Sequence, residues 1–232
     1  MGCLQSRHTD AVESKPGSGV NGVAAKPPGK QPAPGAVGCG SQKGVPPTRE
    51  FSDINQKNYD ETGLSHRQVF SLKQSWKGIK RKMEETGVEM FVRLFKTNSD
   101  LQTLFQGFKH IQSDDELRSN EALEYHATLV MTTLDDAITH IDNYEFVRQL
   151  LHKTGASHIK FEGFHPDNFM QMREPFLEAV RVTLGDRYTE NMQTIYTIAI
   201  TFILQQLIDG IKEAMQAKGI TTGAHPAGSV IS

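Results

Sequence analysis

Cysteine is nearly absent from this chain of 232 residues, and its scarcity excludes two classes of protein. Both cysteines, Cys3 and Cys39, lie within the first fifty residues. A small secreted domain held together by disulfides needs several bridges, so two cysteines in one terminal segment exclude it. For the same reason, the rest of the chain cannot contain a zinc site built on cysteine thiolates.

The chain also lacks an excess of charge of either sign. It has 25 basic and 27 acidic residues, which gives a formal net charge of −2 at pH 7. Proteins that bind nucleic acid usually carry a strong basic excess, because contacts with phosphate supply much of their affinity. This balance argues against nucleic acid as a partner.

Long apolar runs are missing as well. The N-terminus lacks the apolar core of about 7–15 residues that a secretory signal requires. Threonine and glutamine interrupt the most apolar stretch, residues 192–208, whereas a membrane span needs roughly 20 predominantly apolar residues. We expect this stretch to form a buried core helix of a soluble, intracellular domain.

The first fifty residues differ from the rest of the chain in composition. They contain 7 of the 10 prolines, 9 of the 20 glycines and no Phe, Trp or Tyr. Such a segment cannot bury enough apolar surface to offset the entropy lost on ordering. We therefore expect a disordered tether over residues 1–50, a folded domain over 60–217 and a short flexible tail over 218–232.

The chain begins with a pattern for lipid attachment. Glycine follows the initiator methionine and Ser6 stands four residues further on, as N-myristoylation requires. One myristoyl chain binds a membrane only marginally, whereas two acyl chains anchor a protein stably. We expect myristoylation of Gly2 and palmitoylation of Cys3. These would attach the chain to the cytoplasmic face of a membrane, for which the plasma membrane is the first candidate. The alternative is a coincidental Met-Gly start, in which case we expect a cytoplasmic protein.

After Phe51 the apolar residues recur with a period near 3.6, and no convincing strand alternation is found. Capping-box spacing at Ser65–Gln68 and Ser113–Glu116 indicates two helix starts. The pattern predicts an all-α domain, in which Pro175 kinks a helix or frays its start. The expected helices cover about residues 65–79, 88–95, 120–141, 146–158, 166–184 and 189–216.

Two of the nine histidines, His126 and His158, stand on apolar helix faces. His126 precedes Val130 and Leu134 by one and two helical turns, and His158 continues the spacing by fours from Phe146. An imidazole that faces an apolar interior needs a partner. Spacing alone leaves two explanations open, a core histidine satisfied by a hydrogen bond or a pair of metal ligands, and the first is the commoner.

Other chemistries lack their motifs. The chain has no His-Glu-x-x-His zinc motif, no Gly-x-Ser-x-Gly nucleophile turn and no phosphate-binding loop. The pairs Asp114-Asp115 and Asp135-Asp136 do not have the spacing of a calcium loop with its glycine. Hydrolase and nucleotidase activities are therefore not indicated.

Several segments, in the same order and at similar separations, resemble a globin. Residues 89–95 and 101–108 resemble its second helix and the following corner, 125–130 resemble the distal helix, and 155–158 resemble the proximal site. Trp76 falls where the first globin helix carries its tryptophan. The resemblance covers about residues 63–218 and implies the globin fold. It looks most like the neuroglobin-related branch, and the acylated extension is similar to that of the membrane-associated globin X type.

The resemblance implies a haem b (iron protoporphyrin IX) with His158 as the proximal iron ligand. His126 would be the distal histidine, which either donates a hydrogen bond to bound dioxygen or binds the iron as a sixth ligand. The remaining expected haem contacts are Phe105 and Phe108 at the corner, Phe91 and Val130 above the iron, and Phe164, Phe169 and Met172 on the proximal and inner side.

This chain departs from the family pattern at two positions near the expected haem. Thr154 stands one turn before His158, where the family usually has leucine, and its hydroxyl is expected to bond the imidazole. Leu129 stands where neuroglobins carry a basic residue near a haem propionate. We expect Lys109 or His110 to pair with the propionate instead.

The resemblance and the tether together suggest a function. A membrane-attached haem globin would bind dioxygen and other small gaseous ligands and act in redox, sensing or protection, with an electron-transfer partner that the sequence does not identify. It is not expected to be primarily an enzyme. Two alternatives remain: a haem enzyme resembling nitrite reductase or nitric oxide dioxygenase, and a haem-free helical interaction module.

Overall fold

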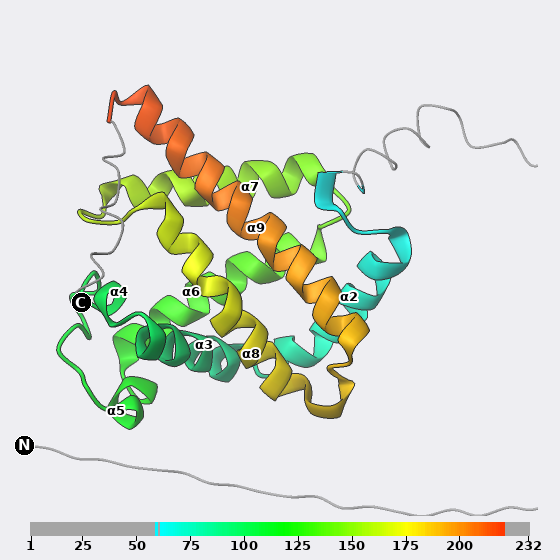
Figure 1. Ribbon diagram of the computed structural model, residues 1–232, viewed down its shortest axis with the longest axis horizontal. Helices are drawn as coiled ribbons and strands as arrows, with labels where there is room; N and C mark the ends of the chain where they lie inside the picture. Colours follow the sequence, from blue (N-terminus) through cyan, green and yellow to red (C-terminus); the bar gives the residue numbers. More distant parts are fainter. Residues whose placement is uncertain (1–58, 60, 221–232) are drawn as a thin grey trace, which may run out of the picture. The chain divides into compact units, whose positions relative to one another are not determined.

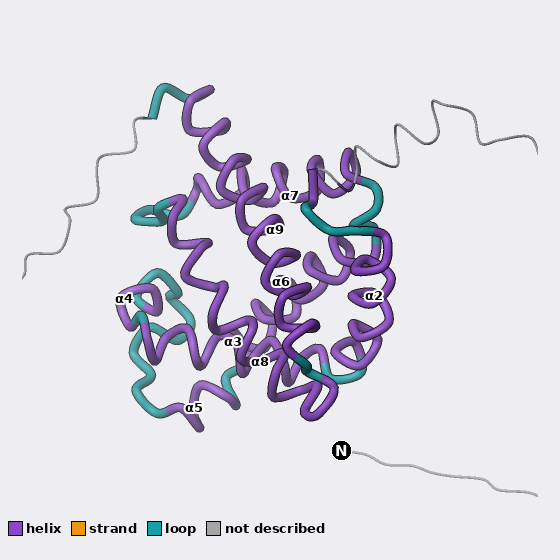
Figure 2. Tube along the Cα trace, turned by 45° about the vertical axis from the view of Figure 1, so that its right-hand side comes forward, coloured by secondary structure: helices purple, strands orange, loops and turns teal. Residues whose placement is uncertain are grey.

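The computed structural model describes residue 59 and residues 61–220. The expected tether, the acylation sites Gly2 and Cys3, and all but three residues of the expected tail lie outside the described residues. The part of the chain that is described is helical and contains no strand, which confirms the all-α class (Figure 2).

The helices follow one another with short connections (Figure 1). The α-helices are α2 (His66–Lys80), α3 (Met83–Thr97), α4 (Ser99–Gln102), α5 (Asp114–Arg118), α6 (Glu121–Thr139), α7 (Tyr144–Ser157), α8 (Arg173–Leu184) and α9 (Glu190–Ala217). The 3₁₀ turns are η1 (His158–Lys160), η2 (Pro166–Met172) and η3 (Gly185–Arg187).

Side chains cap the helices where the sequence places small polar residues. Ser65 and Gln68 form the predicted capping box at the start of α2, and the Ser113 side chain accepts from the amide of Glu116 at the start of α5. Asn120 and Asn143 cap α6 and α7 by accepting from amides one turn further on. Each bond satisfies an amide that the first helical turn leaves unpaired.

One predicted helix is wrong. Residues 166–184 form the 3₁₀ turn η2 and then the separate helix α8. Pro175 is the third residue of α8, in the first turn, where its missing N–H removes no intrahelical bond. The proline therefore does not kink a long helix, and the irregular turn before α8 agrees with the other expectation, a frayed helix start.

The most extensive helix contacts join α7 to α9, and α3 to α6 and α8. α7 and α9 approach backbone to backbone at two glycines. A Cβ on Gly155 would overlap the carbonyl oxygen of Leu207, and a Cβ on Gly210 would overlap the backbone of His152. Any larger residue at either position would force the two helices apart.

Helix α9 contains the apolar stretch noted in the sequence. It is long and apolar enough to cross a membrane by length and composition alone, but 61% of its most apolar window is buried inside the structure. Ile195, Ala199 and Ile203 are among its buried side chains. This burial agrees with the expected core helix.

Candidate functional site

A cavity of about 550 Å³ lies between α3, α6, α7, α8 and α9 and brings together residues far apart in the sequence. Eight of the nine expected contacts of the haem line it. They are Phe91, Phe105, His126, Val130, His158, Phe164, Phe169 and Met172.

The ninth residue, Phe108, does not line the cavity. It is buried behind Phe105, with the two rings stacked at a centroid separation of 4.9 Å. Phe95 completes this group at 5.5 Å from Phe105 and 5.7 Å from Phe108. Phe108 therefore supports the wall that Phe105 presents to the cavity.

His126 projects from α6 into an aromatic wall. Its ring lies edge-on to Phe91 at 5.1 Å and to Phe105 at 5.0 Å. It makes no hydrogen bond within the described residues. Burial, and to a smaller extent the charge that His158 would carry, lower the pKa of His126 to about 4. At neutral pH His126 is a neutral imidazole with at least one unused nitrogen.

His158 directly follows the last residue of α7 and is held by hydrogen bonds. Its Nδ1 lies 2.9 Å from the carbonyl oxygen of Thr154. A carbonyl only accepts, so Nδ1 carries the proton and the Nε2 lone pair is free. Burial lowers the pKa of His158, although the Thr154 bond opposes this effect. Phe164 and Phe169 flank the ring at 5.0 and 4.8 Å.

The hydroxyl of Thr154 does not take the expected position. It donates to the carbonyl oxygen of Leu150 at 2.9 Å, one turn back in α7. A threonine hydroxyl in a helix commonly makes this local bond. The backbone carbonyl of Thr154 therefore contacts the imidazole, and the neighbouring Ser157 hydroxyl donates to the same carbonyl at 2.6 Å.

The cation at this cavity differs from the predicted ones. Neither Lys109 nor His110 lines it, but Lys160 does, two residues after His158. The ammonium group of Lys160 also lies 5.1 Å from the ring centroid of Phe161. The helical spacing did not indicate this position, because Lys160 lies past the end of α7, where the chain turns.

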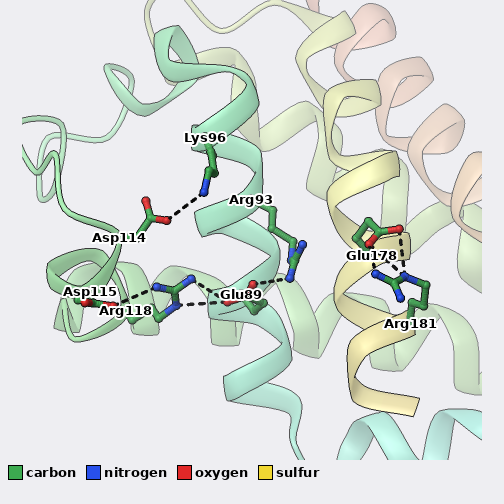
Figure 3. A network of polar contacts seen from close by, with 8 residues as sticks. All are labelled: Glu89, Arg93, Lys96, Asp114, Asp115, Arg118, Glu178 and Arg181. Atoms are coloured by element: carbon green, nitrogen blue, oxygen red, sulfur yellow. Dashed lines mark hydrogen bonds and ion pairs between the residues drawn. The ribbon is translucent and has the colours of Figure 1, made fainter. Parts of the chain in front are cut away.

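A second hollow, of about 700 Å³, lies on the outer side of α3 and α8 and is charged. Figure 3 shows the ion pairs beside it, in which Glu89 joins Arg93 and Arg118 at 2.8 and 3.3 Å. Glu178 and Arg181 pair at 2.7 Å on α8. Ion pairs this exposed contribute little stability each, and the hollow contains no imidazole.

Comparison with known proteins identifies the family. The sequence model of the globin family matches residues 88–207, which is 120 of the 232 residues. The chain therefore belongs to the globin family, as its sequence predicted. As a globin it is a haem-binding protein.

Individual relatives agree with this assignment. Cytoglobin-1 of Oryzias latipes is 27% identical over 156 residues, covering 67% of this chain and 86% of that protein. Neuroglobin of Chaenocephalus aceratus is 27% identical over 146 residues, covering 61% of this chain and 91% of that protein. The crystal structure of a hexacoordinated heme protein from an anhydrobiotic tardigrade, at pH 4, is 35% identical with a TM-score of 0.62 and covers 64% of this chain and 96% of that chain.

The cavity fits a haem on its own geometry. Its volume lies within the range of roughly 300–1,000 Å³ that is usual for cofactor sites, and its walls are mainly aliphatic and aromatic. It offers two neutral imidazoles as nitrogen ligands for iron. Residues 61–220 contain no group of three or more His, Cys, Asp or Glu that could hold a metal ion in another way.

Proposed function

We propose that this globin holds haem b between His158 and His126 and reversibly binds dioxygen and other small gaseous ligands there. The observation that carries the proposal is the pair of neutral imidazoles, one on α6 and one directly after α7, that face a single apolar cavity. When bound, the haem supplies an iron that takes up gaseous ligands and exchanges single electrons.

His158 is the proposed proximal ligand because it is the better oriented of the two. The bond from Nδ1 to the Thr154 carbonyl selects the tautomer and directs the Nε2 lone pair away from α7. It also makes the imidazole a stronger donor. Phe164 and Phe169 limit rotation of the ring.

His126 is the proposed distal residue and has two modes of action. With its unused nitrogen it can occupy the sixth position itself, or with its N–H it can donate to a negatively polarised ligand atom. Such a bond contributes about 1.5–3 kcal/mol, which is roughly tenfold to a hundredfold in affinity. The similarity to the tardigrade protein, a hexacoordinated heme protein, favours the first mode for the resting state.

The remaining residues of the wall exclude water from the cavity and bind the propionate edge of the haem. Phe91, Phe105 and Val130 leave a dry distal space, where a hydrogen bond is stronger than in water. Lys160 is the proposed partner of a haem propionate, because it is the one lysine among the lining residues of this cavity.

The N-terminal sequence suggests where the protein works. Dual acylation of Gly2 and Cys3 would tether the protein to lipid on the cytoplasmic face of a membrane, for which the plasma membrane is the first candidate. A tether raises the effective concentration near membrane partners, which serves redox work, sensing or local protection better than bulk oxygen transport. An electron-transfer partner at the same membrane would complete this role.

The optical spectrum of the dithionite-reduced protein, without added gas, tests the proposal. Sharp, split visible bands are expected, because His126 then fills the sixth position. A single broad band would mean that His126 only donates to external ligands. Absence of a haem band after addition of haem would contradict the proposed site and favour a helical interaction module.

Carbon monoxide binding to His126→Leu separates the two modes of His126. If the imidazole occupies the iron, its removal should speed binding by about tenfold or more, since no competing ligand must first leave. Tyr125→Leu changes the neighbouring exposed residue of α6 and should bind at the wild-type rate. Equal rates in the wild type and His126→Leu would contradict hexacoordination.

A further inference from the structure

Basic residues are concentrated in one short part of the described chain. Residues 66–82, which are α2 and the two residues after it, contain six lysines and arginines and no acidic residue. Residues 83–220, which follow, contain 12 basic and 21 acidic residues. α2 is therefore a basic helix in a domain that is otherwise acidic, and none of the roles proposed above explains this difference.

α2 is fixed so that one of its faces points outward. Its buried side chains include Leu72 and Trp76, and the helix contacts α6, α8 and α9. The indole N–H of Trp76 donates to Oδ1 of Asp135 on α6 at 2.8 Å, which holds the helix in this rotation. On the opposite side, exposed residues recur at intervals of three or four, which places them on one line along the helix. This line, the outer face of α2, consists of Arg67, Phe70, Gln74, Lys77 and the cap residue Arg81.

The cations of this segment differ in whether a carboxylate compensates their charge. Three lysines beside the outer face are paired, at distances between 2.7 and 3.5 Å. They are Lys73 with Asp142, Lys80 with Asp135 and Lys82 with Glu85. The three cations of the outer face make no ion pair with another described residue, and Lys77 donates to the neutral amide of Gln74 at 2.9 Å. Three uncompensated positive charges therefore lie on one line with Phe70, whose side chain is 64% exposed.

This combination is typical of a helix that lies at a lipid surface. Aromatic side chains enter the headgroup region, and cations contact the anionic headgroups around them. The charge of the remaining domain adds an orientation, because an anionic bilayer repels the acidic part and attracts the basic helix. An anionic bilayer therefore fits the outer face of α2 in charge and in the exposed aromatic ring.

The place of α2 in the chain also favours lipid as the partner. The N-terminal sequence that carries the proposed acylation sites, Gly2 and Cys3, enters the described domain just before α2. Attachment at those sites would bring α2 close to the bilayer. One myristoyl chain alone binds only marginally, and a basic surface is one of the second signals that make attachment stable.

Contact of α2 with a bilayer would leave the haem cavity free. No residue of α2 lines that cavity, whereas Leu104, Phe105 and Gln106 of the corner after α4 do. Two views place α2 on the side of the helical domain away from α4 and α5 (Figures 1 and 2). Small ligands can then reach the cavity from the side that faces solvent.

We propose that the outer face of α2 is a docking surface for a bilayer that contains anionic lipid. Arg67, Lys77 and Arg81 contact the headgroups, and Phe70 enters the interfacial region between them. This surface acts together with the proposed acylation but requires neither acyl chains nor haem.

Binding of the full-length, unacylated protein to lipid vesicles tests the proposal. We expect the protein to sediment with vesicles of phosphatidylcholine and phosphatidylserine, and not with vesicles of phosphatidylcholine alone. Binding should weaken as the salt concentration rises from about 0.1 M to about 1 M, because the screening length falls from about 10 Å to about 3 Å. Equal binding to both kinds of vesicle, or binding to neither, would overturn the proposal and leave the haem site untouched.

A charge variant and its matched control locate the surface. Arg67→Gln/Lys77→Gln should weaken binding to the anionic vesicles about thirtyfold, because each cation near the surface contributes about fivefold. Lys153→Gln/Lys212→Gln removes the same charge from exposed positions of α7 and α9 and should bind like the wild type. Equal losses in the two variants would show that net charge alone acts, and would contradict docking through α2.

Phe70→Ser distinguishes a lipid surface from an acidic protein partner. Loss of the ring should weaken vesicle binding about tenfold at any salt concentration, because its burial in the interface is an apolar contribution. Phe146→Ser is the control, since Phe146 is an exposed phenylalanine of α7. Binding to polyglutamate as tight as to the anionic vesicles, with no effect of Phe70→Ser, would overturn lipid as the partner.

A footprint of the wild-type protein tests the orientation without any substitution. Acetylation of lysines, read by mass spectrometry, should be several-fold slower at Lys77 when anionic vesicles are present. The rates at Lys153 and Lys212 should not change, because these lysines lie on other helices. Equal protection of all three lysines, or no protection of Lys77, would contradict docking through the outer face of α2.

Discussion

The two histidines of the cavity occupy similar aromatic surroundings but differ in how they are held. His158 is bonded to the Thr154 carbonyl and lies at the end of α7, whose backbone touches that of α9 at Gly155 and Gly210. His126 is packed by Phe91 and Phe105 but makes no hydrogen bond with another described residue.

In the proposed haem site, this difference distinguishes His158, the proposed permanent ligand, from His126, the proposed exchangeable one. Fixing an imidazole by a hydrogen bond and by a rigid helix contact removes the entropy cost of orienting it for iron. An imidazole held by ring packing alone can move a short distance without breaking a hydrogen bond. We therefore expect His158 to stay bound to the iron and His126 to be displaced by a gaseous ligand.

The largest expected effect is that of removing the fixed ligand. Loss of a group that merely supports a metal ligand costs about 10–100-fold in affinity, so His158→Ala should lose haem faster than wild type by more than that. Transfer of haem to an excess of a haem-scavenging protein measures the rate. Full haem content and a wild-type transfer rate would contradict the proximal assignment.

Acid should destabilise the apoprotein through the loosely held histidine. The pKa of His126 falls from 6.5 to about 4 on folding, so between these values the unfolded chain binds more protons than the folded one. The free energy of unfolding then decreases as the pH drops from 6.5 towards 4, by about 3 kcal/mol from this residue. Urea unfolding of apo wild type and apo His126→Leu across this range measures the difference.

A matched variant shows whether the imidazole itself is responsible for this acid sensitivity. Phe91→Leu disturbs the same wall and keeps His126, so it should retain the pH dependence of the wild type. The explanation would be wrong if His126→Leu lost as much stability in acid as Phe91→Leu does.

Glycine substitutions compare the contact between α7 and α9, near His158, with the contact between α3 and α6, near His126. Gly155→Ala should cost about 1–3 kcal/mol, because its Cβ would meet the backbone carbonyl of Leu207 in α9, which cannot step aside. Gly87→Ala, where α3 meets α6, should cost less, because its Cβ would meet the side chain of Met131. Thermal or urea unfolding of the two apoproteins checks the order, and a larger cost at Gly87 would reverse it.

The smallest expected effect is at the caps. Asn120→Ala at the distal helix α6 and Asn143→Ala at the proximal helix α7 should each cost about 1 kcal/mol. The cost at Asn143 should be the smaller, since contacts with α9 already hold α7. Urea unfolding measures both, and a clearly larger loss for Asn143→Ala would show that α7 is less firmly packed than its glycines indicate.

Local pattern predicted most of the fold. The capping residues Ser65, Asn120 and Thr189 stand at the starts of α2, α6 and α9, where the periodic apolar stripes also begin. The sequence left two outcomes open at Pro175, a kink or a frayed start, because a proline in the first turn of a helix and a proline that kinks a helix look alike in one sequence.

Residue type and spacing indicated that His126 and His158 face the interior. Spacing alone did not distinguish metal ligands from core histidines, so the proposed ligand roles came from the resemblance to globins. Two other features depend on how the chain turns at its corners. They are the position of Phe108 behind Phe105 and the position of Lys160 in the wall of the cavity. The residues of a turn between helices show no periodic apolar pattern, so the positions of their side chains are hard to predict from sequence.

The sequence by itself determined the helical class, the helix starts and the pair of histidines on apolar faces, because these depend on neighbours within a few turns of one chain segment. The tertiary structure alone decided that both imidazoles face one cavity, that the carbonyl of Thr154 and not its hydroxyl orients His158, and that Trp76 donates to Asp135. Each of these contacts depends on the backbone path or on packing between helices, which residue types and their spacing do not specify.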